Sequence, residues 1–257
     1  MTKIIVCGCF GRLGAVICKL AEKEPLTEIV AGVDITPADG GLTFPTYGEI
    51  SQCTIDGDVI VCCLPPTADA DILALIAFSV AKKIPLVMCT TALSSQAEDE
   101  LQSAKTKTAI LRSPNMSLGI NLLSNMMSKA ARLLYNARFD IEIIEKHHNQ
   151  KLDAPSGTAV MLAETINAAL GGEMKMVNDR SCEKATRDRN EIGLHALRGG
   201  SIVGEHSVVF AGLDEVVEFT HIAQSRDAFA VGTLKAAIYI KNKPAGMYSM
   251  QDLINDI

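Results

Sequence analysis

The sequence predicts an α/β protein, with a Rossmann-like dinucleotide-binding domain built on a parallel sheet and a smaller α+β domain with a mixed sheet. Three observations support this fold. The chain opens with an apolar run, a glycine turn and a helical pattern; apolar strands then alternate with helices; and later strands follow one another without helices. We expect the first domain to span 1–117, completed by 227–257, and the second to span 118–226.

The glycine turn Gly8-Cys-Phe-Gly-Arg-Leu-Gly14 follows directly on the apolar run 3–7, and apolar side chains then recur at helical spacing to Ala21. In a dinucleotide fold such a turn lets the backbone approach a pyrophosphate at the helix N-terminus. Cys9 stands at the position of the first glycine of the usual pattern, so this motif alone leaves a simple structural turn as an alternative.

The second strand, 28–33, ends at Asp34, which stands twenty residues past Gly14. A carboxylate at this place is suited to accept hydrogen bonds from the adenosine ribose hydroxyls. The glycine turn and the acid together favour a dinucleotide site over a simple turn.

Strands and helices continue to alternate up to residue 117. We expect strands at 58–64, 85–89 and 108–111 and helices at 68–82 and 94–104. The carboxyl ends of parallel strands share one edge of the sheet, where ligands bind. The sequence therefore predicts Gly8, Asp34, Pro65, Thr90 and Asn115 at that edge.

The pattern changes at Leu118, where a long amphipathic helix runs to Leu134. We then expect a strand at 139–145, a helix at 156–170, a polar loop at 178–190, strands at 192–197, 201–211 and 215–223, and a helix at 228–240 that returns to the first domain.

The stretch 139–158 concentrates the candidate chemistry. Its strand delivers His147 and His148 to one end, and Lys151 follows in the same loop. Ser156 is the expected N-cap of the next helix, whose first turn has free N–H groups that favour an anion. This combination suits a small carboxylate substrate that must be protonated, although a hydrogen-bonded histidine pair with no catalytic role is the alternative.

Charge and cysteine use exclude several classes of function. The net charge of −6 and the lack of a basic run argue against nucleic acid as a partner. We expect neither a signal peptide nor a membrane span, and hence a cytoplasmic protein. The eight cysteines form no Cys-x-x-Cys pair and have no His at ligand spacing, so we expect reduced thiols and no metal. Cys89, at a strand end, is the alternative nucleophile.

Four segments and the glycine turn together resemble the 4-hydroxy-tetrahydrodipicolinate (dihydrodipicolinate) reductase family. The segments are 113–119, 142–158, 195–200 and 204–206, and the resemblance runs from the first strand to the last helix. The resemblance implies hydride transfer from NADH or NADPH to a cyclic dicarboxylate, giving tetrahydrodipicolinate in the diaminopimelate route of lysine biosynthesis. It also implies a homotetramer.

The resemblance assigns roles to individual residues. His147 is implied as the general acid and Lys151 as the second catalytic residue, with His148, Gly157 and Thr158 on the substrate carboxylates. The implied cofactor contacts are Gly8, Cys9, Phe10, Gly11, Arg12, Leu13, Asp34, Cys89, Thr90, Thr91, Ser113, Pro114, Asn115 and Met116.

The chain departs from the family pattern at three places. Asn149 and Gln150 are neutral where many members are basic, and Cys89 replaces a frequent glycine. Ile35 follows Asp34 where members that prefer NADPH often carry an arginine. Without that cation a 2′-phosphate gains little, so we expect NADH to be used at least as well as NADPH.

Two other functions remain as alternatives. An aldehyde dehydrogenase with a cysteine nucleophile would leave the Lys151 motif unexplained. A catalytically silent dinucleotide sensor would fit the neutral Asn149 and Gln150. For His195, His206 and His221 we expect packing or interface roles, and Arg198 either shapes a turn near the substrate or joins two strands.

Overall fold

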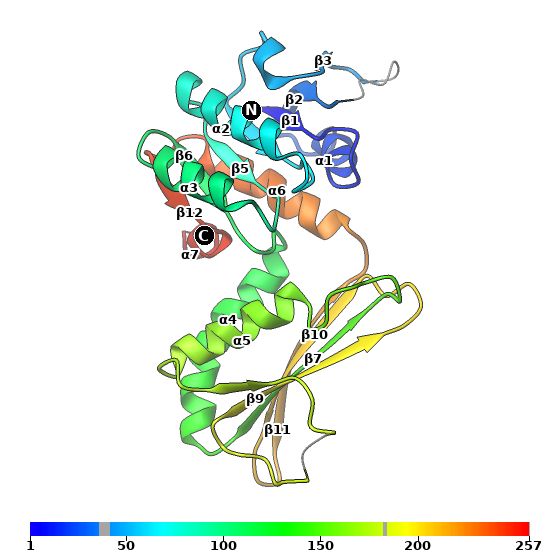
Figure 1. Cartoon of the computed structure of the whole chain (residues 1–257), viewed down its shortest axis with the longest axis vertical. Coiled ribbons are helices and arrows are strands. Elements are labelled where there is room, and N and C mark those ends of the chain that lie inside the picture. Colours follow the sequence, from blue (N-terminus) through cyan, green and yellow to red (C-terminus); the bar gives the residue numbers. More distant parts are fainter. Residues whose placement is uncertain (36–41, 182–183, 257) are drawn as a thin grey trace. The chain divides into compact units, whose positions relative to one another are not determined.

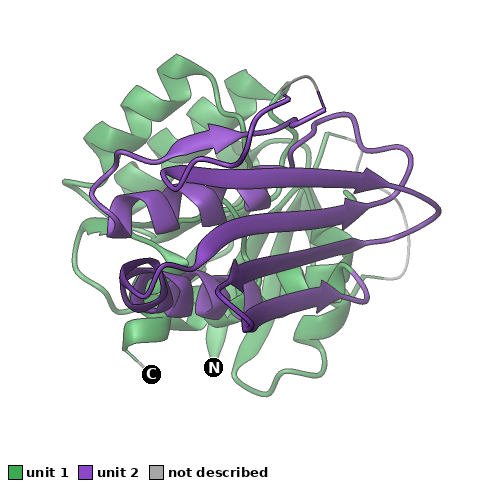
Figure 2. Cartoon of the chain, turned by 90° about the horizontal axis from the view of Figure 1, so that it is seen from below, with its two compact units in different colours: residues 1–118, 226–257 green, residues 119–225 purple. Residues whose placement is uncertain are grey.

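A computed structural model describes residues 1–35, 42–181 and 184–256. The chain divides into two compact units (Figure 2): unit 1 comprises Met1–Leu118 with Arg226–Ile257, and unit 2 comprises Gly119–Ser225. The predicted fold class is confirmed, because unit 1 contains a parallel sheet with helices and unit 2 a mixed sheet.

The sheet of unit 1 has seven parallel strands in the order β12-β6-β5-β4-β1-β2-β3 (Figure 1). The strands are β1 (Thr2–Cys7), β2 (Thr27–Val33), β3 (Thr46–Tyr47), β4 (Val59–Cys62), β5 (Leu86–Met88), β6 (Ala109–Arg112) and β12 (Gly246–Tyr248). The helices are α1 (Gly14–Ala21), α2 (Asp69–Lys82), α3 (Ser95–Ala104), α6 (Asp227–Ile240) and α7 (Met250–Asn255), with a short 3₁₀ helix, η1 (Ile50–Gln52).

Two apolar clusters hold the sheet of unit 1 between its helices. One joins the sheet to α1, α6 and α7 through Ile17, Leu234 and Met250. The other joins it to α2 and α3 through Ile72 and Leu101. The central strands β1, β4, β5 and β6 are buried at nearly every residue, which explains their continuous apolar sequences. α6, the helix expected to return to the first domain, packs in the first cluster and belongs to unit 1.

Unit 2 is a five-stranded sheet, ordered β11-β10-β7-β9-β8, with two helices. Its elements are α4 (Leu118–Asn136), β7 (Asp140–His147), α5 (Gly157–Ala169), β8 (Lys175–Val177), β9 (Glu191–Arg198), β10 (Gly204–Ala211) and β11 (Val216–Ala223). β10 runs antiparallel to β7 and β11, whereas β9 is parallel to β7 and β8. β7 therefore separates β9 from β10, although those two are consecutive in the sequence.

One face of the sheet in unit 2 packs on α4 and α5. Ile141 and Ile143 of β7, together with Val208 and Phe210 of β10, are buried there against Met127. In Figure 2 the strands of this unit lie in front of its helices, so the other sheet face carries no helix of the unit. Ile144, Leu197 and Ile222 on that second face are exposed. We call it the open face.

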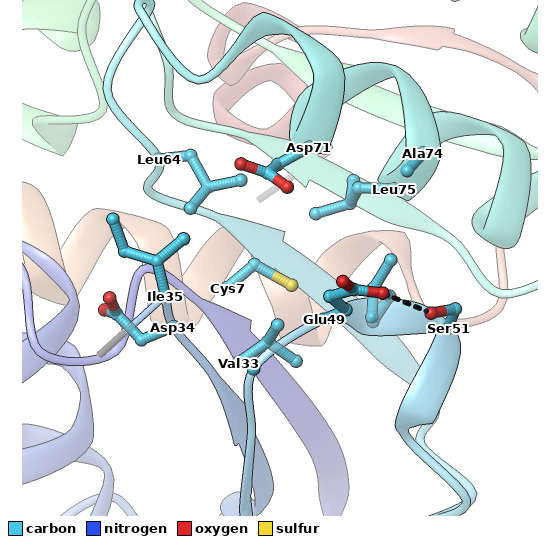
Figure 3. Close-up of a pocket in the computed structure, with 12 residues that line it drawn as sticks. Cys7, Val33, Asp34, Ile35, Glu49, Ser51, Leu64, Asp71, Ala74 and Leu75 are labelled. Carbon is cyan, nitrogen blue, oxygen red and sulfur yellow. Dashed lines mark hydrogen bonds between the residues drawn. The ribbon is translucent and has the colours of Figure 1, made fainter. Parts of the chain in front are cut away.

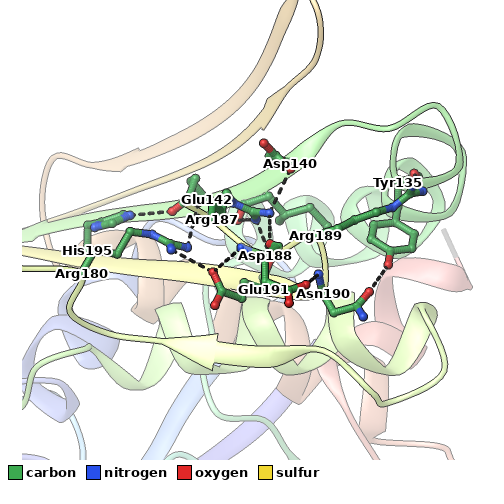
Figure 4. A network of polar contacts seen from close by, with 11 residues as sticks. Tyr135, Asp140, Glu142, Arg180, Arg187, Asp188, Arg189, Asn190, Glu191 and His195 are labelled. Atoms are coloured by element: carbon green, nitrogen blue, oxygen red, sulfur yellow. Dashed lines mark hydrogen bonds and ion pairs between the residues drawn. The ribbon is translucent and has the colours of Figure 1, made fainter. Parts of the chain in front are cut away.

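A polar network holds the described part of the 178–190 loop on β7 and β9 (Figure 4). Glu142 accepts from Arg187 Nε at 2.8 Å and lies 2.6 Å from His195 Nε2, while Arg180 pairs with Glu191 at 2.8 Å. The predicted loop is confirmed for the described residues of this stretch, and His195 belongs to the same network through Glu142. Among the helices of the described chain, none has both the length and the apolar character to cross a bilayer.

Candidate active site

The glycine turn of unit 1 brings backbone against backbone. Gly8 has a φ of +84°, its N–H donates to Val33 O at 2.7 Å, and Gly11 N–H donates to Gly8 O at 3.0 Å. A Cβ at Gly14 would overlap with the Gly8 carbonyl, and one at Gly8 would stand 2.8 Å from Cys63 O. Only glycine fits at these two positions, so the turn presents backbone at the start of α1.

Cys9 fits the turn because its side chain is directed away from the turn surface. The thiol is buried beside β2, where Gly32 provides room: a Cβ there would stand 2.7 Å from Cys9 Sγ. Burial, and then the nearby Asp34 carboxylate, raise the pKa of Cys9 to about 11. The thiol is therefore neutral near pH 7. Beyond it, Phe10 and Leu13 are half-buried and Arg12 is exposed.

Asp34 is fixed at the end of β2 beside a pocket. Its N–H donates to Tyr47 O at 3.0 Å, and its Oδ2 accepts from Phe10 N–H at 3.0 Å, which ties the acid to the glycine turn. The pocket beside it is drawn in Figure 3. Among the residues that the structure describes, three carboxylates and no cation line it; the lining residues are Cys7, Val33, Asp34, Ile35, Gly48, Glu49, Ile50, Ser51, Leu64, Asp71, Ala74 and Leu75.

The residues after β5 lie at the carboxyl edge of the sheet. Thr90 is buried and its hydroxyl donates to Leu64 O at 2.7 Å, whereas Thr91 is exposed. The Cys89 thiol lies 3.6 Å from Thr233 Oγ1. A hydrogen bond between the Cys63 and Cys89 thiols raises the pKa of Cys63 and lowers that of Cys89. Neither the Cys63 thiol nor the Thr233 hydroxyl is a general base, so these contacts do not favour Cys89 as an enzymatic nucleophile.

The segment 113–116 is anchored to the helices of the same unit. Ser113 Oγ accepts from Met250 N–H at 3.2 Å, and a Cβ at Gly232 of α6 would overlap with the carbonyl of the buried Met116. Asn115 Oδ1 accepts from Ser117 N–H at 2.8 Å, and Pro114 is exposed. The structure thus places all the sequence-predicted cofactor residues of unit 1 at the carboxyl edge of its sheet or in the glycine turn.

In unit 2, His147 is the last residue of β7 and is buried. Its Nδ1 lies 2.6 Å from Glu145 Oε2, and its ring makes an edge contact with His206 at a centroid separation of 5.1 Å. Burial lowers the pKa of His147, and the Glu145 carboxylate offsets only part of that effect; the charges of Lys151 and Arg198 lower it further. The imidazole therefore gains its proton less readily than a free histidine.

His148 and Lys151 lie in the turn after β7. Lys151 N–H donates to His148 O at 3.2 Å, and Lys151 Nζ lies 2.9 Å from Asp153 Oδ1. The hydrogen bond from Lys151, offset in part by burial, lowers the pKa of Asp153. The Lys151 ammonium group therefore belongs to a residue that stands four residues after His147 and seven before Thr158.

α5 begins as the sequence predicts. Ser156 is its N-cap, and its Oγ accepts from Ala159 N–H at 3.2 Å. Gly157 is exposed and Thr158 half-buried in the first turn. A helix start of this kind supports a bound carboxylate. The segment 147–158 therefore contains an imidazole, an ammonium group and an anion-binding helix start.

Sequence reasoning assigned no role at this site to Glu145, and it did not predict that Arg198 and His206 contact the residues of this segment. Glu145 accepts from both terminal nitrogens of Arg198, at 2.7 and 2.6 Å, and His206 Nε2 lies 2.9 Å from Ser156 Oγ. Burial, and then the charge of His147, lower the pKa of His206 to about 3. His206 is therefore a neutral packing residue. Within the described ranges, no group of three His, Cys, Asp or Glu side chains is arranged to hold a metal.

A parallel sheet with a backbone-lined glycine turn and an acid after its second strand, joined to a mixed-sheet unit, defines the class of two-domain oxidoreductases that use a nicotinamide dinucleotide. The chain belongs to the dihydrodipicolinate reductase family. The model described as "Dihydrodipicolinate reductase, N-terminus" matches residues 2–116, and that described as "Dihydrodipicolinate reductase, C-terminus" matches residues 119–254.

Individual relatives match over nearly the whole chain. The 4-hydroxy-tetrahydrodipicolinate reductase of Clostridium tetani is 42% identical, covering 99% of this chain and 98% of its own. That of Caldanaerobacter subterraneus subsp. tengcongensis is 44% identical with the same coverage. A dipicolinate-bound dihydrodipicolinate reductase from Paenisporosarcina sp. TG-14 shares the fold, with a TM-score of 0.80 at 21% identity, over 98% of this chain and 99% of that one.

Proposed function

We propose that the chain is a 4-hydroxy-tetrahydrodipicolinate reductase of the diaminopimelate route of lysine biosynthesis. It transfers a hydride from NADH or NADPH to the cyclic dicarboxylate, which loses water and yields tetrahydrodipicolinate. Relatives that carry this name match the chain over its length. The single observation that carries the proposal is the segment 147–158, where His147, Lys151 and the start of α5 stand together.

Unit 1 binds the dinucleotide in this proposal, through residues 1–117 and 227–257. The turn fits a pyrophosphate, since Gly8 and Gly14 leave backbone where side chains would otherwise stand. Asp34 is positioned for the ribose hydroxyls, with one oxygen occupied by Phe10 N–H. The strand ends at 89–91 and 113–116 line the remainder of the site. The bound nicotinamide supplies the hydride.

Residues 118–226 bind the substrate. Its carboxylates lie at the start of α5, on Gly157 and Thr158, and at His148, where the helix N–H groups and the Lys151 ammonium favour negative charge. His147 gives a proton to the ring as general acid, from Nε2, because its Nδ1 faces Glu145. Lys151 stabilises negative charge that develops on the substrate.

NADH is used at least as well as NADPH. Ile35 lies in the pocket beside Asp34, and Glu49 and Asp71 line the same pocket (Figure 3). A 2′-phosphate placed among three carboxylates with no cation is repelled, whereas a ribose hydroxyl donates to Asp34.

The enzyme is a homotetramer in which the open face of unit 2 contacts a second copy. This face exposes Ile144, Leu197 and Ile222 beside the ion pair of Lys146 with Glu205, a mixture typical of subunit interfaces. Ile144→Glu is expected to lower the particle mass measured by light scattering. Leu133→Glu is the control, since Leu133 is exposed on α4, and an equal loss of mass there would contradict this interface.

The cysteine chemistry supports a cytoplasmic location. The seven cysteines of the described ranges are free thiols, five of them buried, as expected in a reducing compartment.

The decisive experiment measures oxidation of NADH and NADPH with enzymatically generated substrate. Wild type, His147→Gln and Lys151→Ala are compared, with Lys129→Ala, an exposed lysine of α4, as control. We expect turnover to fall about 100-fold or more in both site variants while NADH binding persists, because general acid catalysis contributes on this scale. If the folded wild type bound NADH without turnover, the proposed enzyme function would be rejected in favour of the catalytically silent sensor.

A further inference from the structure

Glu145 occupies an unusual place for a carboxylate. It lies on the face of β7 that also carries Ile141 and Ile143, and its side chain has no exposed surface. A buried charge is costly unless partners satisfy it. Although burial raises the pKa of Glu145, hydrogen bonds from Arg198, His147 and Ser156 N–H bring it below its usual value. The group is therefore an anion.

Each oxygen of Glu145 has two hydrogen-bond partners. Oε2 accepts from Arg198 Nη1 at 2.7 Å and lies 2.6 Å from His147 Nδ1. Oε1 accepts from Arg198 Nη2 at 2.6 Å and from Ser156 N–H at 3.0 Å. One carboxylate thus links the imidazole to the first N–H of the α5 start.

These contacts decide the tautomer of His147. A carboxylate anion only accepts hydrogen bonds, so Nδ1 must carry the proton and Nε2 is the nitrogen that exchanges one. Gly204 leaves space at His147 Nε2, because a side chain at position 204 would place its Cβ 3.2 Å from that nitrogen. The Glu145 contact therefore selects which nitrogen can donate to a ligand.

Arg198 extends the same assembly to the lysine loop. Its Nη2 also donates to Asp153 O at 2.6 Å, and Asp153 pairs with Lys151. His147, Lys151 and the α5 start are consequently held by two side chains, Glu145 and Arg198.

We propose that Glu145 and its counter-ion Arg198 are positioning residues that fix the His147 tautomer and hold the acid in register with the start of α5. The inference rests on the proposed function, in which His147 is the general acid. The rival explanation is a carboxylate that only stabilises the fold.

Glu145→Gln separates the two explanations. It removes the charge that supports the His147 imidazolium and offers one accepting oxygen in place of two. We expect kcat to fall about 100-fold, as for a misplaced catalytic group, with the KM for NADH within about twofold of wild type. The descending limb of the kcat/KM profile should move to lower pH, because the imidazolium is less stabilised. Glu145→Asp, which keeps the charge, should restore the position of that limb.

Glu142→Gln is the matched control. Glu142 lies on the same strand but on its other face, and it contacts His195 at the same 2.6 Å. We expect this control to leave the pH profile unchanged. A Glu145→Gln variant that loses thermal stability but keeps the wild-type pH profile would overturn the proposal in favour of the structural explanation.

A second measurement is independent of turnover. Nitrogen-15 NMR of His147 in the ligand-free wild type should show the neutral ring protonated at Nδ1, and Glu145→Gln should shift it toward a mixture of tautomers. A wild-type ring protonated at Nε2 would refute the positioning role. This readout holds even if the wild type proves inactive, an outcome that would reject the proposed function alone.

Discussion

Gly204 lies directly against His147: a Cβ at Gly204 would stand 3.2 Å from His147 Nε2 and 3.5 Å from Cδ2. Gly204→Ala should therefore displace the imidazole by a few tenths of an ångström and crowd the nitrogen that donates the proton. We expect turnover to fall about tenfold, within the loss known for misplaced catalytic groups, with wild-type NADH binding. Steady-state kinetics and NADH titration measure both effects.

Gly199→Ala is the control for this substitution. Its Cβ would meet only Leu197, at 3.7 Å, which is ordinary packing distance. If Gly199→Ala and Gly204→Ala reduced turnover equally, contact with His147 would not be the cause.

The pH dependence of the reaction should report His147. A general acid must be protonated to act, and burial lowers the pKa of this imidazole below the usual value of about 6.5. We expect kcat/KM for the dicarboxylate to be highest below that lowered pKa and to decline as pH rises through it. His147→Gln should remove this decline from the residual activity. A rate profile that rises with pH over the same range would assign the imidazole the role of base instead.

The strand 139–145 shows how far sequence alone could go. Its alternation predicted that Phe139, Ile141 and Ile143 share one face, and Glu145 falls on that face by the same period. A buried carboxylate was thus predictable. Its partners were not, because Arg198 stands 53 residues away and Ser156 stands 11, and local periodicity says nothing about which strands pair.

In unit 1, too, local sequence patterns predicted the elements but not the contacts between them. The strands, helices and glycine turn followed from apolar runs and spacing, but Gly32, which makes room for Cys9, lies on a different strand. β3, β8 and β12 were missed because strands of two or three residues carry no period. β10 begins at Gly204, three residues after its predicted start, because the chain from 199 to 203 forms the connection from β9.

His206 should make the protein less stable in acid. Its pKa is about 3 in the folded protein and about 6.5 when unfolded, so the unfolded chain binds one more proton between these values. The unfolding free energy then falls by about 1.4 kcal/mol for each pH unit below 6.5 from this group alone. His206→Asn should unfold along a shallower acid curve in urea titrations at successive pH values. Parallel curves for the two proteins would show that His206 is not held neutral.

Gly14→Ala should disable the glycine turn. The added Cβ would overlap with the Gly8 carbonyl, and neither backbone can move without breaking the contacts of β1. We expect NADH affinity to fall at least tenfold by fluorescence titration. Gly11→Ala should be milder, because its Cβ would stand 3.1 Å from the same oxygen and a small shift relieves it. Equal effects at both positions would argue against backbone crowding as the reason for glycine.

Ile35→Arg should shift the cofactor preference toward NADPH. Ile35 is exposed in the pocket beside Asp34, where Glu49 and Asp71 add two further carboxylates. A guanidinium at this position supplies a cationic partner for the 2′-phosphate of NADPH. A charge-assisted hydrogen bond of about 1.5–3 kcal/mol corresponds to a gain of roughly 10- to 150-fold in the preference for NADPH. The ratio of kcat/KM for NADPH to that for NADH is the measurement. Ile35→Gln, which is polar but uncharged, should change this ratio by less than threefold; if it matched the arginine variant, electrostatic repulsion would not be what limits the use of NADPH.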